Sequence, residues 1–286
     1  MPYAPSSHSA VPLRTPFIVQ KDLNSFTGLA KTSSFQTLTK LSPYVFQAFS
    51  LCVCTFDPML SIEIFTFNPF QENTYLVYDE TGNAMVVDAG CYEKDEEKEL
   101  SDFITSKNLT VKAIINTHSH IDHILGAYYV KDKYKVPLLI HPKDESTLRS
   151  GKIAASIYGL SRYTDVSADG YLSEGEPVKL GNQSFEVLFL PGHAPGHVGF
   201  YHREQKLLLG GDVLFHRSIG RTDLPGGDYD TLIESIHKKI FTLPDDVIVY
   251  PGHGPATTVG EEKVGNPYCA LPGESRDPRS RSYKPS

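Results

Sequence analysis

The chain has 286 residues, of which 40% are hydrophobic and 11% aromatic, and its formal net charge is -7. This length and composition suffice for a sizeable apolar core, so a globular enzyme is expected. The acidic balance argues against nucleic acid or an anionic membrane as partner, because both normally require a clustered basic surface, and we expect a small-molecule substrate instead.

Residues 1–58 differ in composition from the rest of the chain, because Asp22 and Asp57 are their only acidic residues while serine and threonine are frequent. We expect an N-terminal extension that is disordered or not native, with Met59 as the biological start in the second case. A targeting segment is the alternative, since such segments are serine-rich and poor in acids, but Arg14 is the only arginine here.

Residues 59–266 have the patterning of one mixed domain. Strands are predicted at 62–67, 74–79 and 84–88, with a hairpin turn at 80–83, followed by a helix at 95–107 and a strand at 111–116. Further on, a helix is predicted at 122–134, a short strand at 137–140 and a polar stretch at 151–169. Strands at 184–190, 198–202 and 206–210 precede a helix at 229–241 and a buried strand at 247–250.

Hairpins dominate the first part of this domain, and helices and strands interleave later. The order predicts an α+β fold with two sheets covered by helices in four layers. Residues 267–286 are rich in proline, serine and arginine and are predicted to be a basic tail. The cysteines form neither a disulfide framework nor a CxxC zinc motif, which favours a reducing cytoplasm; they are Cys52, Cys54, Cys91 and Cys269.

Residues 117–123, with the sequence THSHIDH, follow an apolar strand and contain three imidazoles and a carboxylate. In an extended segment His118 and His120 point the same way and can bind one ion, while Asp122 and His123 lie one turn on and can address a second. Imidazole and carboxylate suit zinc and other borderline divalent ions. The motif therefore predicts two divalent metal ions, with zinc expected and iron or manganese as alternatives.

Three further candidate ligands share one form, a glycine beside a metal-capable residue at the close of an apolar strand. Glycine there lets the backbone turn sharply and lets an ion approach closely. The candidates are His193, Asp212 and His253.

Over about residues 62–266 the chain resembles the metallo-β-lactamase superfamily, and within it the glyoxalase II-like (hydroxyacylglutathione hydrolase-like) branch. The resemblance rests on VDAG at 87–90, the HxHxDH motif at 118–123, GHAPGH at 192–197, GDVLF at 211–215, GRTD at 220–223 and PGHG at 251–254. It implies an αββα sandwich with two metal ions. One ion would be held by His118, His120 and His193, the other by Asp122, His123 and His253, with Asp212 bridging them.

The resemblance also implies a reaction, the hydrolysis of a thioester or related ester by a hydroxide bridging the two metals. Asp122 would orient that hydroxide and accept its proton. Asp88 would hold a ligand histidine from behind, with a helix or turn cap as the alternative role. For His197 we expect an ordinary loop position, with support of the metal site as the alternative.

Two departures from the family pattern bear on the substrate. Asp212 and His123 stand where zinc β-lactamases that open antibiotic rings have cysteine and arginine, so antibiotic hydrolysis is not expected. Glyoxalase II enzymes carry a lysine and an aromatic residue two apart where this chain has Arg221 and Asp223. Arg221 is the candidate substrate-binding residue, as an anchor for a carboxylate.

Three other functions remain open from the sequence. A persulfide dioxygenase shares the GRTD stretch and binds a single iron, for which His118, His193 and Asp212 would be the ligands. A complete second ligand set favours hydrolysis over this oxygen chemistry. A nuclease of the same superfamily is disfavoured by the acidic balance, and a metal-binding protein without turnover is the third alternative.

Overall fold

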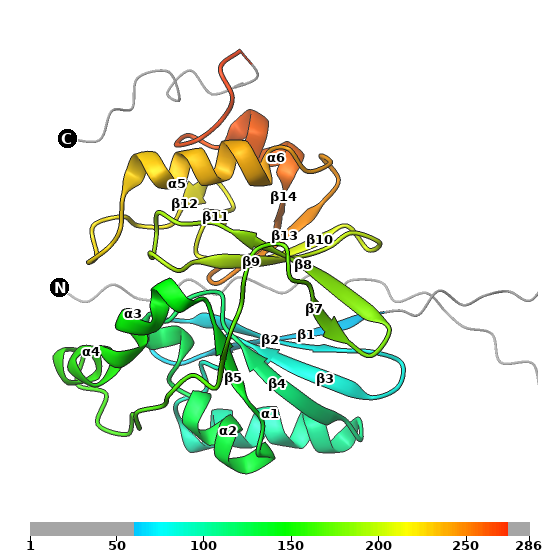
Figure 1. Cartoon of the computed structure of the whole chain (residues 1–286), viewed down its shortest axis with the longest axis vertical. Coiled ribbons are helices and arrows are strands. Elements are labelled where there is room, and N and C mark those ends of the chain that lie inside the picture. Colours follow the sequence, from blue (N-terminus) through cyan, green and yellow to red (C-terminus); the bar gives the residue numbers. More distant parts are fainter. Residues whose placement is uncertain (1–59, 274–286) are drawn as a thin grey trace, which may run out of the picture. The chain divides into compact units, whose positions relative to one another are not determined.

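The structure is a computed structural model that describes residues 60–273, and two sheets in it lie between two groups of helices (Figure 1). The predicted extension at 1–58 and the arginine-rich part of the predicted tail lie outside the described residues. The described part has the α+β fold with four layers, αββα, as expected from the element order.

The first sheet has the strand order β1-β2-β3-β4-β5-β6. Its first three strands are antiparallel and joined by tight turns, and β3 to β6 are parallel. Their bounds are β1 Ser61–Phe67, β2 Glu72–Tyr78, β3 Asn83–Val87, β4 Thr110–Ile115, β5 Leu138–Ile140 and β6 Gly170–Tyr171.

The second sheet has the order β14-β13-β10-β9-β8-β7, and only β10 and β13 within it are parallel. Its strands are β7 Val178–Leu180, β8 Gln183–Phe189, β9 Val198–His202, β10 Leu207–Gly211, β13 Ile248–Pro251 and β14 Thr257–Thr258. A small hairpin, β11 Leu214–Phe215 and β12 Ser218–Ile219, follows β10.

Helices cover the outer face of each sheet (Figure 1). On the first sheet they are α1 Lys94–Ser106 and α2 Ala127–Tyr134, with α3 Glu145–Arg149 and α4 Gly151–Ile157 at one end. On the second they are α5 Tyr229–Ser235, continued by a π-helical turn at Ile236–Ile240, and α6 Val259–Gly265. In α1 three acidic residues, Asp95, Glu96 and Glu97, occupy the first turn, where the helix dipole favours them.

Three apolar clusters hold the layers together. The one between the sheets includes Val77, Ile115, Phe185 and Phe200, all buried. The outer clusters join the first sheet to α1 and α2, and the second sheet to α5 and α6. Alternate residues of a strand face opposite sides, so central strands such as β10 are buried throughout.

Some elements differ from the sequence prediction. The helix predicted at 122–134 begins at Ala127, because residues 121–123 form a separate 3-10 turn. The stretch at 151–169, for which only polar character was predicted, contains the helix α4. Packing continues past residue 266, since Cys269 is buried against the second outer cluster. Within residues 60–273, no helix is both long and apolar enough to cross a membrane.

Candidate metal centre

The seven predicted ligands come together at one end of the two sheets. His118 and His120 lie in the loop after β4, and Asp122 and His123 lie in the 3-10 turn that follows it. The remaining three come from the second sheet, in segments that follow β8, β10 and β13 respectively: His193, Asp212 and His253. Side chains far apart in the sequence therefore share one site because they follow strands that end at the same edge.

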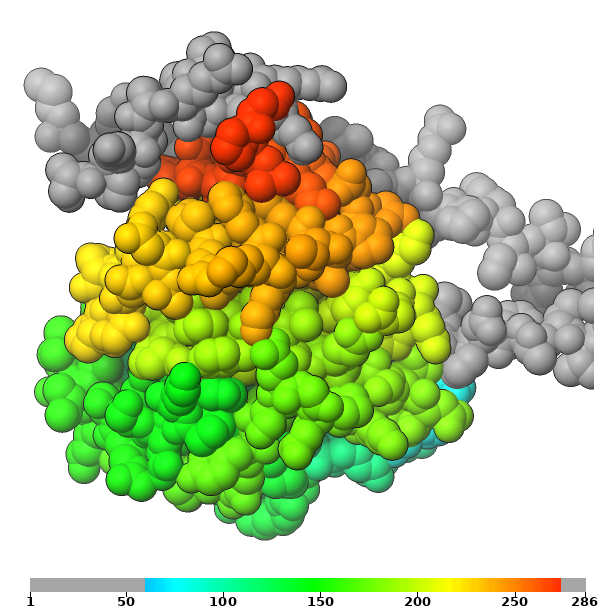
Figure 2. Space-filling model, turned by 45° about the horizontal axis from the view of Figure 1, so that its top comes forward, coloured from blue at the N-terminus to red at the C-terminus, as the bar shows by residue number. Residues whose placement is uncertain are grey.

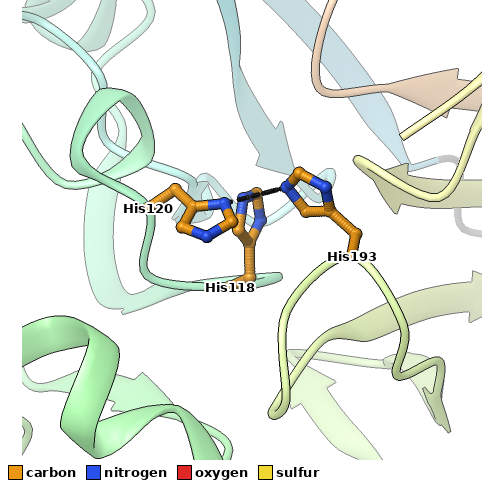
Figure 3. Close-up of side chains that lie close together, drawn as sticks. All are labelled: His118, His120 and His193. Atoms are coloured by element: carbon orange, nitrogen blue, oxygen red, sulfur yellow. Dashed lines mark hydrogen bonds between the residues drawn. The ribbon is translucent and has the colours of Figure 1, made fainter. Parts of the chain in front are cut away.

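The first group is a cluster of three histidines (Figure 3). The Nε2 atom of His193 lies 3.2 Å from Nε2 of His118 and 2.8 Å from Nδ1 of His120. The rings of His118 and His120 approach from the first sheet and that of His193 from the second. Three ring nitrogens thus converge on one point between the sheets.

Hydrogen bonds behind these rings show which nitrogens face the centre as lone pairs. The Thr117 hydroxyl donates to Asp88 Oδ2 at 2.6 Å, so its oxygen accepts from Nδ1 of His118 at 3.1 Å. Nδ1 of His193 donates to the carbonyl oxygen of Arg221 at 2.7 Å. Both Nε2 atoms are then unprotonated in the neutral rings and face each other, an arrangement that a cation between them would stabilise.

Burial also favours neutral imidazole in this cluster. Burial, reinforced by the neighbouring histidines, lowers the pKa of His118 well below its usual value. It likewise lowers the pKa of His120, to about 4. Neutral imidazole is the form that binds a metal, so this cluster fits a divalent cation.

The second group consists of Asp122, His123 and His253. Asp122 Oδ2 lies 3.1 Å from Nε2 of His253 and 3.6 Å from Nε2 of His123. Nδ1 of His253 faces the carbonyl oxygen of Gln71 at 3.2 Å, which turns the other ring nitrogen toward the site. Two imidazoles and a carboxylate therefore offer three ligand atoms to a second ion.

Asp212 lies between the two groups. Its Oδ2 atom is 3.6 Å from Nε2 of His193 in the first group and 3.5 Å from Nε2 of His253 in the second, and its Oδ1 is 3.5 Å from Nε2 of His123. Oδ1 of Asp212 and Nε2 of His123 are buried without a hydrogen-bond partner among the described residues. Asp212 is therefore placed to offer an oxygen to either group.

The charges of the second group also call for a cation. Burial acts to lower the pKa of His123, but the carboxylates of Asp122 and Asp212 outweigh it and raise this pKa well above its usual value. Burial acts to raise the pKa of Asp212, yet His123 and the other histidines lower it far below its usual range. A positive charge is thus favoured between the carboxylates, and a bound divalent ion would supply it.

Asp88 lies behind His123, where the sequence analysis placed a supporting carboxylate. Its Oδ2 is 3.1 Å from Nδ1 of His123, and its Oδ1 accepts from the backbone N–H of Thr117 at 2.7 Å. Asp88 has a positive φ of 53°, uncommon for a residue other than glycine. Since both oxygens are engaged by protein groups, the side chain supports a candidate ligand rather than facing the centre.

His197 lies in the loop between β8 and β9, as expected from the sequence, but there it contacts two candidate ligands. The ring is buried, and its Nε2 accepts a hydrogen bond of 3.0 Å from the backbone N–H of Asp212. It also stacks on His118, with ring centroids 4.9 Å apart. The sequence contained one indication of this role, the spacing of four residues from His193. That spacing does not reveal whether the side chain is buried.

Two buried residues that belong to no sequence motif also contact the candidate ligands. The amide of Asn116 donates to the carbonyl oxygens of His118 and His123, at 3.1 and 3.0 Å, and so closes the loop that carries four candidate ligands. Glu72 Oε1 lies 3.8 Å from Nδ1 of His123. Burial raises the pKa of Glu72 well above its usual value. Neither residue belongs to a pattern that sequence inspection would single out.

Glycine allows the close approach at Gly252, before His253. A Cβ atom there would lie 2.1 Å from Asp212 Oδ1 and 2.7 Å from Cε1 of His123. Any side chain at this position would displace the candidate bridging carboxylate, which is the physical reason for glycine in this loop.

The site opens into a cleft of about 1050 Å³. Arg221, the predicted substrate-binding residue, lies on its wall, and its guanidinium pairs with both oxygens of Asp223 at 2.7 Å. This pairing with Arg221 lowers the pKa of Asp223 to about 2. The positive charge of Arg221 is therefore already partnered.

Comparison with known proteins identifies the family of this chain. The profile of the Metallo-beta-lactamase superfamily matches residues 67–253. The hydroxyacylglutathione hydrolase GloC of Haemophilus influenzae is 40% identical over 211 residues, which are 73% of this chain and 98% of that protein.

Two solved structures are also similar. BLEG-1, described as a B3 metallo-beta-lactamase, has a TM-score of 0.66 and 36% identity over 73% of this chain and 99% of its own. TTHA1623, in a di-iron-bound form, has a TM-score of 0.65 and 37% identity over 72% of this chain and 99% of its own.

Proposed function

The chain belongs to the metallo-beta-lactamase superfamily as a metal-dependent hydrolase, and we propose that it uses two divalent ions to cleave a thioester. The observation that carries this proposal is the complete second group, Asp122, His123 and His253, beside the three-histidine cluster, with Asp212 between them. A single-iron dioxygenase needs His118, His193 and Asp212 alone, and gives the second group no role.

The residues divide the work as follows. The seven candidate ligands hold the ions, while Asp88 and His197 fix the orientation of His123 and Asp212. Two bound divalent cations would acidify a water molecule between them and polarise the carbonyl of the scissile bond. Zinc is the expected metal, and the di-iron form of TTHA1623 makes iron the alternative.

Asp122 is the proposed proton acceptor, since it lines the cleft as well as the second group. Burial acts to raise its pKa, but His123 and His253 outweigh burial and lower it. The carboxylate is therefore ionised and can orient the attacking water and take its proton. The water oxygen bonds to the acyl carbon, the C–S bond breaks, and the leaving thiolate receives the proton, giving a carboxylic acid and a thiol.

Thioesters of glutathione are the first substrates to test, because GloC is a hydroxyacylglutathione hydrolase by name. The purified full chain, reconstituted with zinc or iron, would be assayed for thiol release from S-lactoylglutathione and for oxygen uptake with glutathione persulfide. We expect thiol release without oxygen uptake. Oxygen uptake with one iron per chain would contradict the proposal and establish the dioxygenase.

β-Lactam hydrolysis is a second candidate, favoured by the 36% identity to BLEG-1. Aspartate in place of cysteine at position 212 argued against this activity from the sequence. The similarity to a protein described as a metallo-beta-lactamase is the reason to test it alongside thioester hydrolysis. Opening of a chromogenic cephalosporin, measured on the same preparation, would decide between the two. We expect its kcat/KM to be far below that for thioesters.

A further inference from the structure

The cleft beside the metal centre has an apolar wall that the candidate ligands do not use. Ile153 and Ile157 of α4, together with Tyr158 directly after it, line the cleft. Their exposed fractions are 66%, 74% and 49%. Figure 2 shows the segment that contains α3 and α4, in green, beside the loop that precedes α5, in yellow, and residues from both segments line this cleft.

This exposure is unusual for one short helix. Ile153 and Ile157 are four residues apart, so they project from the same side of α4, while Ala155 on its other side is buried in the first outer cluster. Phe70 extends the wall by packing edge-on against Tyr158, with ring centroids 5.2 Å apart. The helix is thus anchored by one side and presents aliphatic side chains to the cleft.

Outside the metal centre, the described lining of the cleft carries little charge and so suits an uncharged ligand group. Outside the metal centre, Arg221 is the one charged residue that lines it among residues 60–273, and Asp223 already pairs with that guanidinium. Ser146, Thr147 and Ser150 are the polar side chains near α4. An extended anionic group would find no unpaired cation along this wall, whereas an apolar chain would cover exposed aliphatic surface.

We infer that the substrate carries an apolar chain that lies along Ile153, Ile157 and Tyr158 while its thioester carbonyl reaches the metal centre. This inference rests on the proposed thioester hydrolysis and names the class of substrate for it. The wall continues directly into the metal centre, since His120, Asp122 and His193 line the same cleft. The chain can belong to the acyl or to the thiol side of the bond, and the experiment distinguishes them.

The test is the dependence of kcat/KM on chain length in two series. The first contains N-acetylcysteamine thioesters of acetate, butyrate, hexanoate and octanoate, and the second contains thioacetates of alkyl thiols of the same lengths. Complete burial of a methylene group corresponds to about a fourfold gain, so partial cover in an open cleft predicts about twofold per methylene in one series. Flat dependence in both series would overturn the inference.

Variants connect the effect to this wall. In the double variant Ile153→Ser with Ile157→Ser we expect the dependence of kcat/KM on chain length to vanish. The control is Ile64→Ser on β1, where an isoleucine with an exposed fraction of 46% lies outside the cleft lining. The control must keep the full dependence, and a double variant that also keeps it would overturn the inference.

A binding measurement separates this inference from the proposed function. Ketone analogues, with a methylene inserted between sulfur and carbonyl, cannot be hydrolysed at that bond, and their dissociation constants can be measured by calorimetry. If no thioester is cleaved, the proposed function fails, and the inference is then judged by these analogues alone. Affinity that rises with chain length in the wild type and not in the double variant supports it, and constant affinity refutes it.

Discussion

The backbone N–H of Asp212 donates a hydrogen bond of 3.0 Å to the imidazole Nε2 of His197. Because the same ring stacks on His118, a single buried side chain positions both the carboxylate between the two metal groups and a ligand of the first group. A side chain that is itself not a candidate ligand can therefore influence both groups.

We expect His197→Ala to weaken metal binding about 10- to 100-fold while two ions still bind at saturating metal, as is usual for a group that supports ligands. The measurement is a competition titration against a chromophoric chelator. His202→Ala is the matched control, since His202 is equally buried but bonds to Gln183 on the second sheet. Equal affinities in the two variants would contradict the role of His197.

Asp88→Ala should affect the second group more than the first. The change removes two hydrogen bonds from Thr117 and the contact with His123, so we expect the affinity for the ion of the second group to fall about 10- to 100-fold in the same titration. Asp169→Ala removes a comparable backbone hydrogen bond, to Leu138, together with an ion pair to Lys131, and serves as control. Loss of affinity in the control as well would point to general destabilisation.

Gly252→Ala should displace the carboxylate of Asp212, because the added Cβ would lie 2.1 Å from Oδ1. We expect loss of at least one ion per chain and at least a 100-fold fall in thioester hydrolysis, about 3 kcal/mol of transition-state stabilisation. In the control Gly210→Ala, the added Cβ would meet Val249 at 3.1 Å, away from the ligands. Metal content by mass spectrometry of the native protein distinguishes the two, and a Gly252→Ala protein with two ions would contradict the geometry.

The turn between β2 and β3 predicts a pH effect on stability that is independent of the metals. Asp79 Oδ1 accepts from the backbone N–H groups of Thr81 and Asn83, at 3.0 and 2.9 Å. Burial acts to raise the pKa of Asp79, but hydrogen bonds from these two residues outweigh it and lower the pKa. A carboxyl with a lower pKa when folded stabilises the protein above its unfolded pKa, and this contribution disappears as the pH falls through the folded pKa.

For Asp79→Asn we therefore expect the free energy of unfolding to decrease by about 1 kcal/mol at about pH 7, and by less at about pH 3. Urea unfolding of both proteins across this range measures the difference. A difference that stays constant with pH would show that the ionised form of Asp79 is not what stabilises the turn.

Much of the site could be predicted because its ligands lie in short motifs at strand ends. Three histidines within six positions indicate a metal site: His118, His120 and His123. A preceding glycine at the end of a strand marks the other three, His193, Asp212 and His253. Their convergence follows from the layer order, which brings the ends of β4, β8, β10 and β13 together. Their distances, and the place of Asp212 between two groups, required the structure.

The supporting residues and the cleft could not be predicted in the same way. The roles of His197, Asn116 and Glu72 depend on their burial and not on their residue type alone. Burial in turn depends on contacts between segments that are distant in the sequence. The helix α4 was missed because it is short, begins with glycine and exposes its isoleucines instead of burying them, so it lacks a strong core-facing pattern. The same exposure is what suggests its function.

Zinc titration of the chelator-stripped full chain measures how many ions the site holds. We expect two ions per chain in the wild type, one in His253→Ala, and none held tightly in Asp212→Ala, because the last variant removes the candidate ligand between both groups. A wild-type chain that binds a single ion, or an Asp212→Ala chain that still binds two with unchanged affinity, would contradict this expectation.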